Sequence, residues 1–280
     1  AVVLICEGKT FIAGADISEF GKPPKGTSLF DALNAIEGAS IPVVAAIHGT
    51  ALGGGLEVAL TCHYRVAVPS AKCGLPEVKL GLLPGAGGTQ RLPRIVGVEK
   101  ALEMVTSGEH VGAKQCAEMG LVDALVDEGK LREGAIAFAR KIVAEKRPLK
   151  RVRDMNDKVE AARGKPEIFA AFRRANAKKF RGFDAPEANI KCIEAAVNQP
   201  FDEGLKTERK LFMECLFSNE SKSLIHVFFG ERAVAKVPFV PKDTAPLDIK
   251  KVGVVGAGTM GGGIAMVYAN AGFPVLLKDS

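Results

Sequence analysis

The chain has 280 residues, of which 47% are hydrophobic and 25% charged, a balance typical of folded rather than disordered proteins. The net charge of +6 suits an anionic ligand, but only 6% of the residues are aromatic and Trp is absent, so nucleic acid is not the expected partner. The six cysteines form no C-x-x-C pair and the four histidines show no metal-ligand spacing. This usage predicts buried free thiols in a reducing compartment, and no metal site.

Short strand-like runs alternate with helical runs over residues 1–150, a pattern that predicts an α/β domain. We expect strands at Val2–Ile5, Val43–Ile47, Tyr64–Val68 and Val122–Val126. We expect helices at Leu29–Gly38, Gly54–Thr61, Val98–Ser107, Ala113–Met119 and Leu131–Ala144. The first run reads as a buried strand that needs neighbours, so we interpret the chain as a piece of a longer protein.

The first glycine-rich segment, Gly8–Asp16, follows the first expected strand. Small residues let a ligand approach the backbone closely, and the N–H groups of such a turn can donate to an oxygen atom. The alternative interpretation is an ordinary turn between a strand and a helix.

The second segment, His48–Glu57, places three consecutive glycines at the start of an expected helix. Each glycine inside a helix costs about 1 kcal/mol relative to alanine, so their presence indicates a need for backbone freedom. A helix N-terminus without side chains favours developing negative charge, and Glu57 falls in the first turn. The alternative is tight packing between strand and helix.

The third segment, Gly74–Arg91, carries Glu77 in an otherwise apolar stretch. A carboxyl group in apolar surroundings has a raised pKa and can hold a proton near neutral pH. The loop Pro84–Gly88 again exposes backbone. The alternative is a loop glutamate that forms an ion pair with Lys79 or Arg91.

In this order, the A-G-A-D turn, the A-L-G-G-G-x-E segment and the P-E-x-x-x-G-x-x-P-G-A-G-G-T-Q-R-L run resemble the crotonase (enoyl-CoA hydratase/isomerase) superfamily over about residues 1–150. The resemblance implies a ββα superhelix that hydrates trans-2-enoyl-CoA without a cofactor. It implies an oxyanion hole made by the backbone N–H groups of Ala15 and Gly54. Glu57 would activate the water and Glu77 would protonate Cα. The implied substrate contacts are Ala13, Asp16, Ile17 and Gly85.

Two other functions stay open. A Δ3,Δ2-enoyl-CoA isomerase can work with one acid–base residue at the Glu77 position, whereas the additional Glu57 favours hydration. A non-catalytic module that binds acyl-CoA would need neither glutamate.

Residues 151–235 lack strand patterns, and one helical pattern follows another. By the resemblance, this helical linker region packs back on the first domain and completes it. Its basic clusters, Lys146–Arg153 and Arg173–Arg181, are interpreted as solvated helix faces; the alternative is that some of these side chains line the entrance for a phosphate-bearing ligand. Residues 236–248 contain three prolines and predict an extended connector.

A further α/β unit is expected at residues 249–280. A strand from Lys251 leads into G-x-G-x-x-G, and a helix, a second strand at Pro274–Leu277 and an aspartate follow. This order is typical of the first βαβ of a Rossmann domain and favours NAD over NADP. It also explains the uncharged run Val252–Leu277 better than a membrane span does. The expected NAD-binding residues are Gly256, Gly258, Thr259, Met260, Gly261 and Asp279.

The second unit resembles the start of 3-hydroxyacyl-CoA dehydrogenase. The order hydratase, helical linker, dehydrogenase is that of multifunctional enzymes of fatty-acid β-oxidation, so a parent that also oxidises 3-hydroxyacyl-CoA is implied. Linker helices that complete the hydratase domain imply a monomeric parent, in peroxisomes or in the bacterial cytoplasm. Because the resemblance stops at Ser280, the chain alone is expected to lack dehydrogenase activity.

Overall fold

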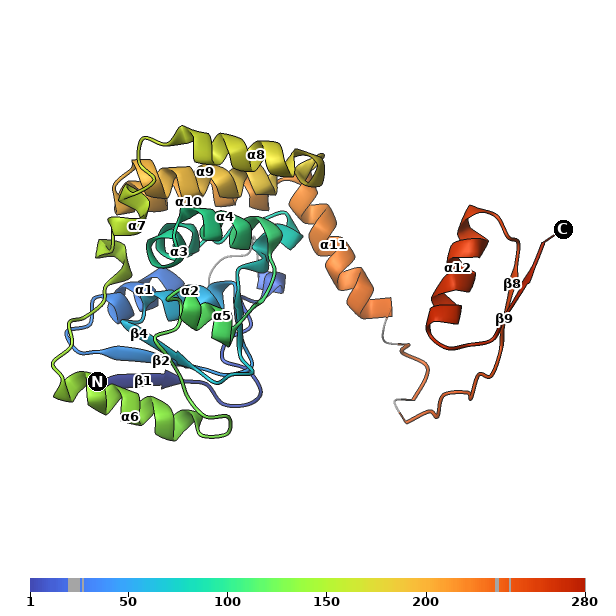
Figure 1. Cartoon of the computed structure of the whole chain (residues 1–280), viewed down its shortest axis with the longest axis horizontal. Coiled ribbons are helices and arrows are strands. Elements are labelled where there is room, and N and C mark those ends of the chain that lie inside the picture. Colours follow the sequence, from blue (N-terminus) through green and yellow to red (C-terminus); the bar gives the residue numbers. More distant parts are fainter. Residues whose placement is uncertain (20–25, 27, 235–236, 242, 280) are drawn as a thin grey trace. The chain divides into compact units, whose positions relative to one another are not determined.

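The computed structural model describes residues 1–19, 26, 28–234, 237–241 and 243–279. The chain divides into two compact units, Ala1–Glu231 and Arg232–Ser280. The boundary expected between residues 235 and 236 lies outside the described residues. In the first unit, helices lie on both sides of a small sheet (Figure 1).

A parallel sheet of four strands forms the base of the first unit, in the spatial order β1 (Val2–Ile5), β2 (Val43–Ile47), β4 (Tyr64–Ala67), β7 (Ala124–Leu125). Every residue of β2 and β4 is buried, as expected for strands covered on both faces. The expectation that β1 is buried is wrong, because β1 lies at the edge and Val2 is 47% exposed. The expected strand over residues 122–126 shortens to β7.

A second, smaller sheet contains β3 (Thr50–Leu52), β5 (Lys72–Gly74) and β6 (Val111–Gly112). β3 and β5 are parallel, and β5 and β6 are antiparallel. These strands have two or three residues each, too few to show the alternation by which a strand is recognised in a sequence. The sequence pattern therefore does not predict this sheet. The sheet nevertheless positions the turn before Glu57, because β3 ends just before Gly53.

Five helices match the sequence expectation to within one residue at each end. They are α1 (Leu29–Glu37), α2 (Gly54–Thr61), α4 (Val98–Ser107), α5 (Ala113–Glu118) and α6 (Leu131–Ala144). A further helix, α3 (Gly88–Val96), is not predicted, because an initial glycine and Pro93 both argue against a helix. Short 3-10 helices lie at Ile17–Glu19, Pro76–Leu80 and Val152–Asp154.

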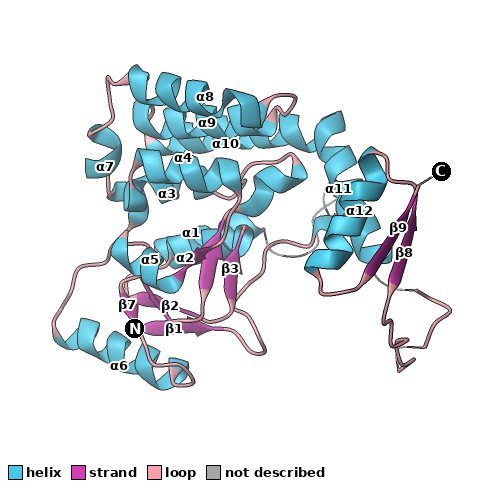
Figure 2. Cartoon of the chain, turned by 45° about the vertical axis from the view of Figure 1, so that its right-hand side comes forward, coloured by secondary structure: helices cyan, strands magenta, loops and turns pink. Residues whose placement is uncertain are grey.

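The remaining helices of the first unit are α7 (Asp157–Glu160), α8 (Pro166–Phe180), α9 (Ala185–Asn198), α10 (Phe201–Leu216) and α11 (Asn219–Val234). Among them, α8, α9 and α10 form a layer over α3 and α4, α7 lies beside this layer, and α11 runs away from it (Figure 2). α9 packs against α3, α4 and α10. Its side chains Ile190, Ile193 and Val197 belong to the same buried cluster as Leu92 and Leu102. Burial of this apolar area from both segments stabilises one shared core.

The second unit consists of β8 (Val252–Val255), α12 (Thr259–Asn270) and β9 (Val275–Lys278). The two strands are parallel, and Val252 pairs with Val275. The uncharged run of residues 252–277 is therefore divided between two strands and a helix. None of the helices that the structure describes is long and apolar enough to cross a bilayer.

Candidate active site

Glu57 lies in the first turn of α2 and is only 3% exposed. Its Oε1 accepts hydrogen bonds from the backbone N–H groups of Ala86, at 2.7 Å, and Gly88, at 2.8 Å. Gly88 makes this approach possible, because a Cβ atom there would lie 2.8 Å from the same oxygen. The Glu57 carboxylate is thus held at the N-terminus of α3, where the helix dipole favours negative charge.

Glu77 lies in the 3-10 helix Pro76–Leu80. The residue as a whole is partly buried, but its Oε2 is shielded from solvent and has no hydrogen-bond partner among the described residues. The alternative of an ion pair with Lys79 or Arg91 is wrong. Lys79 pairs with Glu109 at 3.0 Å. Arg91 forms a buried pair with Glu37 at 2.7 Å.

Gly53 brings the two glutamates towards each other. It immediately precedes α2, which carries Glu57, and has a φ of 52°, in the left-handed region that favours glycine. A Cβ atom at Gly53 would lie 3.0 Å from Oε1 of Glu77. The residue just before the helix that carries Glu57 therefore lies beside the carboxyl group of Glu77 and leaves no room there for a side chain.

The backbone nitrogen of Ala15 lies beside Gly54. A Cβ atom at Gly54 would lie 3.8 Å from the Ala15 nitrogen. As the first residue of α2, Gly54 has an N–H without a partner inside the helix. The turn of Ala15 is attached to β3, because Ile12 forms a bridge with Ala51 and accepts a hydrogen bond from the Leu52 N–H at 3.0 Å.

The environments of the two carboxyl groups differ. Burial raises the pKa of Glu57, and the N–H groups of Ala86 and Gly88 and the charge of Arg91 oppose this. Burial, followed by the charge of Glu57, raises the pKa of Glu77 well above its usual value. The only hydrogen bond that lowers the pKa of Glu77 comes from its own backbone. Glu77 is therefore the better holder of a proton and Glu57 the better base.

The other residues expected to contact substrate lie in two places. Ala13 and Asp16 are exposed and Ile17 is partly buried, all on the turn that carries Ala15. Gly85 lies in the loop before α3 and faces α10, since a Cβ atom there would lie 2.6 Å from the Phe212 ring. The structure thus adds α10 to the surroundings of the site.

A further buried carboxyl group beside the site, Glu208 of α10, is not predicted from the sequence. It is 1% exposed and accepts hydrogen bonds from the N–H groups of Gly87, at 2.6 Å, and Thr89, at 3.0 Å. One signal could have indicated it: Phe201, Gly204 and Glu208 lie three and four residues apart on the buried face of α10. An acid on such a face needs partners.

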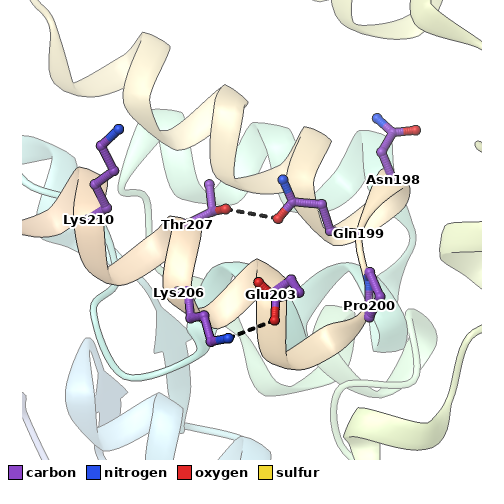
Figure 3. Close-up of a pocket in the computed structure, with 7 residues that line it drawn as sticks. All are labelled: Asn198, Gln199, Pro200, Glu203, Lys206, Thr207 and Lys210. Carbon is purple, nitrogen blue, oxygen red and sulfur yellow. Dashed lines mark hydrogen bonds and ion pairs between the residues drawn. The ribbon is translucent and has the colours of Figure 1, made fainter.

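A hollow of about 440 Å³ lies where α9 meets α10 (Figure 3). Two pairs of its side chains already bond to each other: Thr207 to Gln199 at 2.8 Å, and Lys206 to Glu203 at 2.7 Å. The residues that line it are Asn198, Gln199, Pro200, Glu203, Lys206, Thr207 and Lys210. Neither Glu57 nor Glu77 lines it, and we assign no ligand to it.

The second unit places its glycines as a dinucleotide-binding turn requires. Gly256 follows β8 with a φ of 97°, and Gly258 caps α12. A Cβ atom at Gly261 would lie 1.7 Å from the Gly256 carbonyl oxygen, so helix and strand pack too closely for any side chain. Asp279, after β9, accepts a hydrogen bond from the Ala257 N–H at 3.3 Å. These residues fit a pyrophosphate at the helix N-terminus and a ribose beside the aspartate.

Known protein families match two parts of the chain. Residues 1–195 match the enoyl-CoA hydratase/isomerase family. The chain belongs to this family. Residues 251–280 match the NAD-binding domain of 3-hydroxyacyl-CoA dehydrogenase. Both resemblances drawn from the sequence are confirmed, and the first extends through most of α9 rather than ending near residue 150.

Relatives of the family share both parts of the chain. The peroxisomal bifunctional enzyme of Danio rerio is 41% identical over 284 residues, which cover 100% of this chain and 39% of that protein. The fatty acid oxidation complex subunit alpha of Shewanella loihica is 43% identical over 299 residues, covering 99% and 41%. The solved enoyl-CoA hydratase of Bacillus anthracis is 29% identical, covers 82% of this chain and 78% of that one, and has a TM-score of 0.47. The chain spans about two fifths of the length of these curated relatives.

All six cysteines are free thiols; five are buried and Cys6 is partly exposed. In the part of the chain that the structure describes, no group of three or more His, Cys, Asp or Glu side chains is placed to hold a metal ion.

Proposed function

We propose that the chain hydrates trans-2-enoyl-CoA to 3-hydroxyacyl-CoA in fatty-acid β-oxidation. The observation that carries the proposal is the pair of shielded carboxyl groups, Glu57 and Glu77, whose environments differ. The Ala15 nitrogen lies beside Gly54, the first residue of the helix that carries Glu57. Membership of the enoyl-CoA hydratase/isomerase family supports the same chemistry.

In the first step, Glu57 takes a proton from a water molecule while the water oxygen forms a bond to Cβ. The electron pair of the double bond moves towards the thioester carbonyl, so an enolate forms. The two N–H donors that already hold Glu57 fix its orientation as a base. A positioned base of this kind contributes about 10²–10⁴ in rate.

The enolate oxygen carries the charge that develops in this step. The adjacent N–H groups of Ala15 and Gly54 would donate to it, one from a turn and one from a helix N-terminus. Donors fixed in advance at such an oxygen are worth about 10²–10³ each in rate. Small residues at both positions leave room for the thioester.

In the second step, Glu77 delivers its proton to Cα, which completes the addition of H and OH. The raised pKa of Glu77 supports this role, because the carboxyl must be protonated before the step. The proton taken by Glu57 then restores Glu77 through solvent. No cofactor enters this balance.

We further infer that the whole protein oxidises the 3-hydroxyacyl-CoA product with NAD. NAD would be held by the second unit and would accept the hydride. The residues expected to bind it are Gly256, Gly258, Thr259, Met260, Gly261 and Asp279. The fit of Gly261 and Asp279 to a dinucleotide supports this, as does the match to the NAD-binding domain.

The partners and compartment follow from the same proposal. An acyl-CoA thioester is the expected small-molecule partner. We infer a monomer, because α9 covers α3 and α4 within one chain. The name of the Danio rerio relative supports a peroxisome. The bacterial cytoplasm is the alternative compartment, because a bacterium, Shewanella loihica, also has a relative of the chain.

The test is the hydration of crotonyl-CoA by the full-length protein and by its Glu57→Gln and Glu77→Gln variants. Each substitution removes one proton-transfer group while keeping the side-chain shape, so each is expected to lower kcat at least about 10²-fold. The loss of absorbance at the conjugated double bond measures the rate. The exposed Glu203→Gln variant on α10 serves as the control.

Hydration that persists at the control rate in both variants would contradict the proposal. The unpartnered Oε2 of Glu77 also favours a second activity, a shift of the double bond between the 3 and 2 positions. A Glu57→Gln protein that loses hydration but still isomerises 3-enoyl-CoA would assign that shift to Glu77 alone.

A further inference from the structure

Glu208 holds the first residues of α3 from the side of α10. Its Oε1 accepts a hydrogen bond from the Gly87 N–H at 2.6 Å, and its Oε2 accepts one from the Thr89 N–H at 3.0 Å. The Thr89 hydroxyl donates to Oε2 as well. That hydroxyl is oriented by Gln90, whose side-chain amide donates to the Thr89 oxygen at 2.9 Å. The hydroxyl proton is therefore left for Glu208.

Four consecutive N–H groups alternate between two carboxylates. Those of Ala86 and Gly88 donate to Glu57, whereas those of Gly87 and Thr89 donate to Glu208. The segment of residues 86–89 is thus held from both sides by buried acids. Because these are the N–H groups at the start of α3, they have no partners inside the helix and both acids gain from its dipole.

We propose that Glu208 is a positioning residue for hydration, which keeps residues 86–89 in the one conformation that directs two N–H groups at Glu57. The inference rests on the proposed function. Without Glu208, the Gly87 and Thr89 N–H groups would be buried donors without acceptors, and the peptide planes between them would turn to find new ones. The peptide planes of Ala86 and Gly88 belong to the same segment, so the donors to Glu57 would move with them.

Glu208 also acts on the second glutamate through its charge. The negative charge of Glu208 contributes to raising the pKa of Glu77, after burial and the charge of Glu57. Burial and the charge of Glu57 also raise the pKa of Glu208 itself to about 8, so this contribution comes only from the ionised fraction of Glu208. The positioning role and the charge thus favour the same division of labour, with Glu57 as base and Glu77 as acid. Glutamine at position 208 would weaken the positioning role, because its amide nitrogen donates and cannot accept from an N–H group. It would also remove the charge, because glutamine is neutral.

The position of Glu208 in the chain makes this role specific to the helical region. Residue 208 lies beyond residues 1–195, which match the hydratase/isomerase family. α10 approaches closely enough at Gly204, where a Cβ atom would lie 2.1 Å from the Gln90 side-chain oxygen. The helical region thereby contributes a carboxylate to the site as well as apolar cover.

The experiment measures crotonyl-CoA hydration by the full-length protein carrying Glu208→Gln. We expect kcat to fall about 10- to 100-fold, because small misplacements of a reacting group cost this much. KM is expected to change by less than about threefold, since Glu208 is not among the groups expected to hold the thioester. The control is Glu203→Gln, which alters an exposed glutamate of the same helix and should leave both parameters unchanged.

A double variant separates positioning from a general loss of folded protein. If Glu208 acts mainly through Glu57, adding Glu208→Gln to Glu57→Gln should lower hydration by much less than the factor seen for Glu208→Gln alone, with the small remainder due to the loss of the Glu208 charge near Glu77. A further fall by the full factor seen for Glu208→Gln alone would overturn the proposal, as would an unchanged kcat in the single variant. Undiminished hydration by the Glu57→Gln protein would instead overturn the proposed function. The same assay measures this single variant on its own, so the two failures can be told apart.

Should Glu208→Gln not fold, Thr89→Ala takes its place. This variant removes one of the three donors to Glu208 and leaves the carboxylate charge in place. We expect a smaller fall of kcat, about 3- to 10-fold, that is absent in the Glu57→Gln background. A Thr89→Ala protein with unchanged kcat would overturn the proposal.

Discussion

At the scale of single residues, Glu57 is buried and Glu77 is partly buried with its Oε2 shielded from solvent, and the two carboxyl groups differ in their hydrogen-bond partners. Glu57 receives two N–H groups from another segment, whereas Glu77 receives only its own and leaves Oε2 without a partner among the described residues. A buried group without compensation costs folding free energy. Such a cost is typical of sites where chemistry, rather than stability, determines the residue.

This cost predicts a stability that depends on pH. The pKa of Glu77 is raised in the folded state above its ordinary value of 4.5. As pH rises above that value, the unfolded chain loses the proton first, so the folded state becomes relatively less stable. We therefore expect the Glu77→Gln variant to gain melting temperature relative to the unaltered protein as the pH rises. This difference should grow from pH 4.5 up to the raised pKa of Glu77.

Thermal unfolding followed by circular dichroism across this pH range measures the effect. Glu214→Gln, on an exposed face of α10, is the matched control, because its charge stays in water. A Glu77→Gln protein whose relative melting temperature falls or stays flat as pH rises would contradict the prediction.

At the scale of elements, the start of α2 depends on two neighbouring glycines with different roles. A Cβ atom at Gly55 would lie 2.1 Å from the backbone oxygen of Ile12, so α2 packs directly on the segment that leads to Ala15. At Gly54 the nearest atom would be the Ala15 nitrogen at 3.8 Å, which is ordinary contact. One glycine serves packing, and the other leaves room between two N–H groups.

Two alanine substitutions distinguish these roles. Gly55→Ala is expected to destabilise the fold by about 1–3 kcal/mol, because backbone must move to admit the methyl group. Gly54→Ala should unfold at the temperature of the unaltered protein, yet hydrate crotonyl-CoA about 10²-fold more slowly, because its methyl group lies between the expected donors. Denaturant unfolding and the hydration assay, run on both proteins, check this. Equal activity of Gly54→Ala and the unaltered protein would contradict the oxyanion role of this position.

Elements differed in how well the sequence predicted them. Strand β2 and helices α2, α4 and α6 match the expected bounds, because each is a continuous apolar or amphipathic run with a clear boundary. The second sheet could not be predicted, because its strands are short and are stabilised by partners distant in the chain. α3 could not either, because local propensity opposes it and packing against α4, α9 and α2 overrides that propensity.

At the scale of the whole molecule, the chain forms two compact units, and every residue proposed to act in hydration lies in the first. That unit includes α9, which buries side chains against α3 and α4, and α10, which packs against α9 and α3 and supplies Glu208. The boundaries at residues 150, 235 and 248 stay predictions. The structure describes a shared core that crosses the first of them.

This organisation predicts the effect of truncation. A chain that ends at residue 231 should hydrate crotonyl-CoA at the rate of the 280-residue chain, because it keeps the whole first unit. A chain that ends at residue 198 loses α10 and should lose activity at least about 10-fold, since the donors at Gly87 and Thr89 would be left without acceptors. Hydration rates of the three chains measure this, with their melting curves as the control for folding. Full activity of the shortest chain would contradict it.

The sequence by itself determined the family, the α/β class, and the glycine-rich segments around Glu57 and Glu77. These follow from local signals: residue type, spacing and the backbone freedom of glycine. Only the tertiary structure decided which groups share the site. Glu208 lies 121 positions after Gly87, and it reaches residues 87–89 only because α10 packs beside α3. No local pattern encodes such a contact, because it depends on how the layers of the first unit pack together.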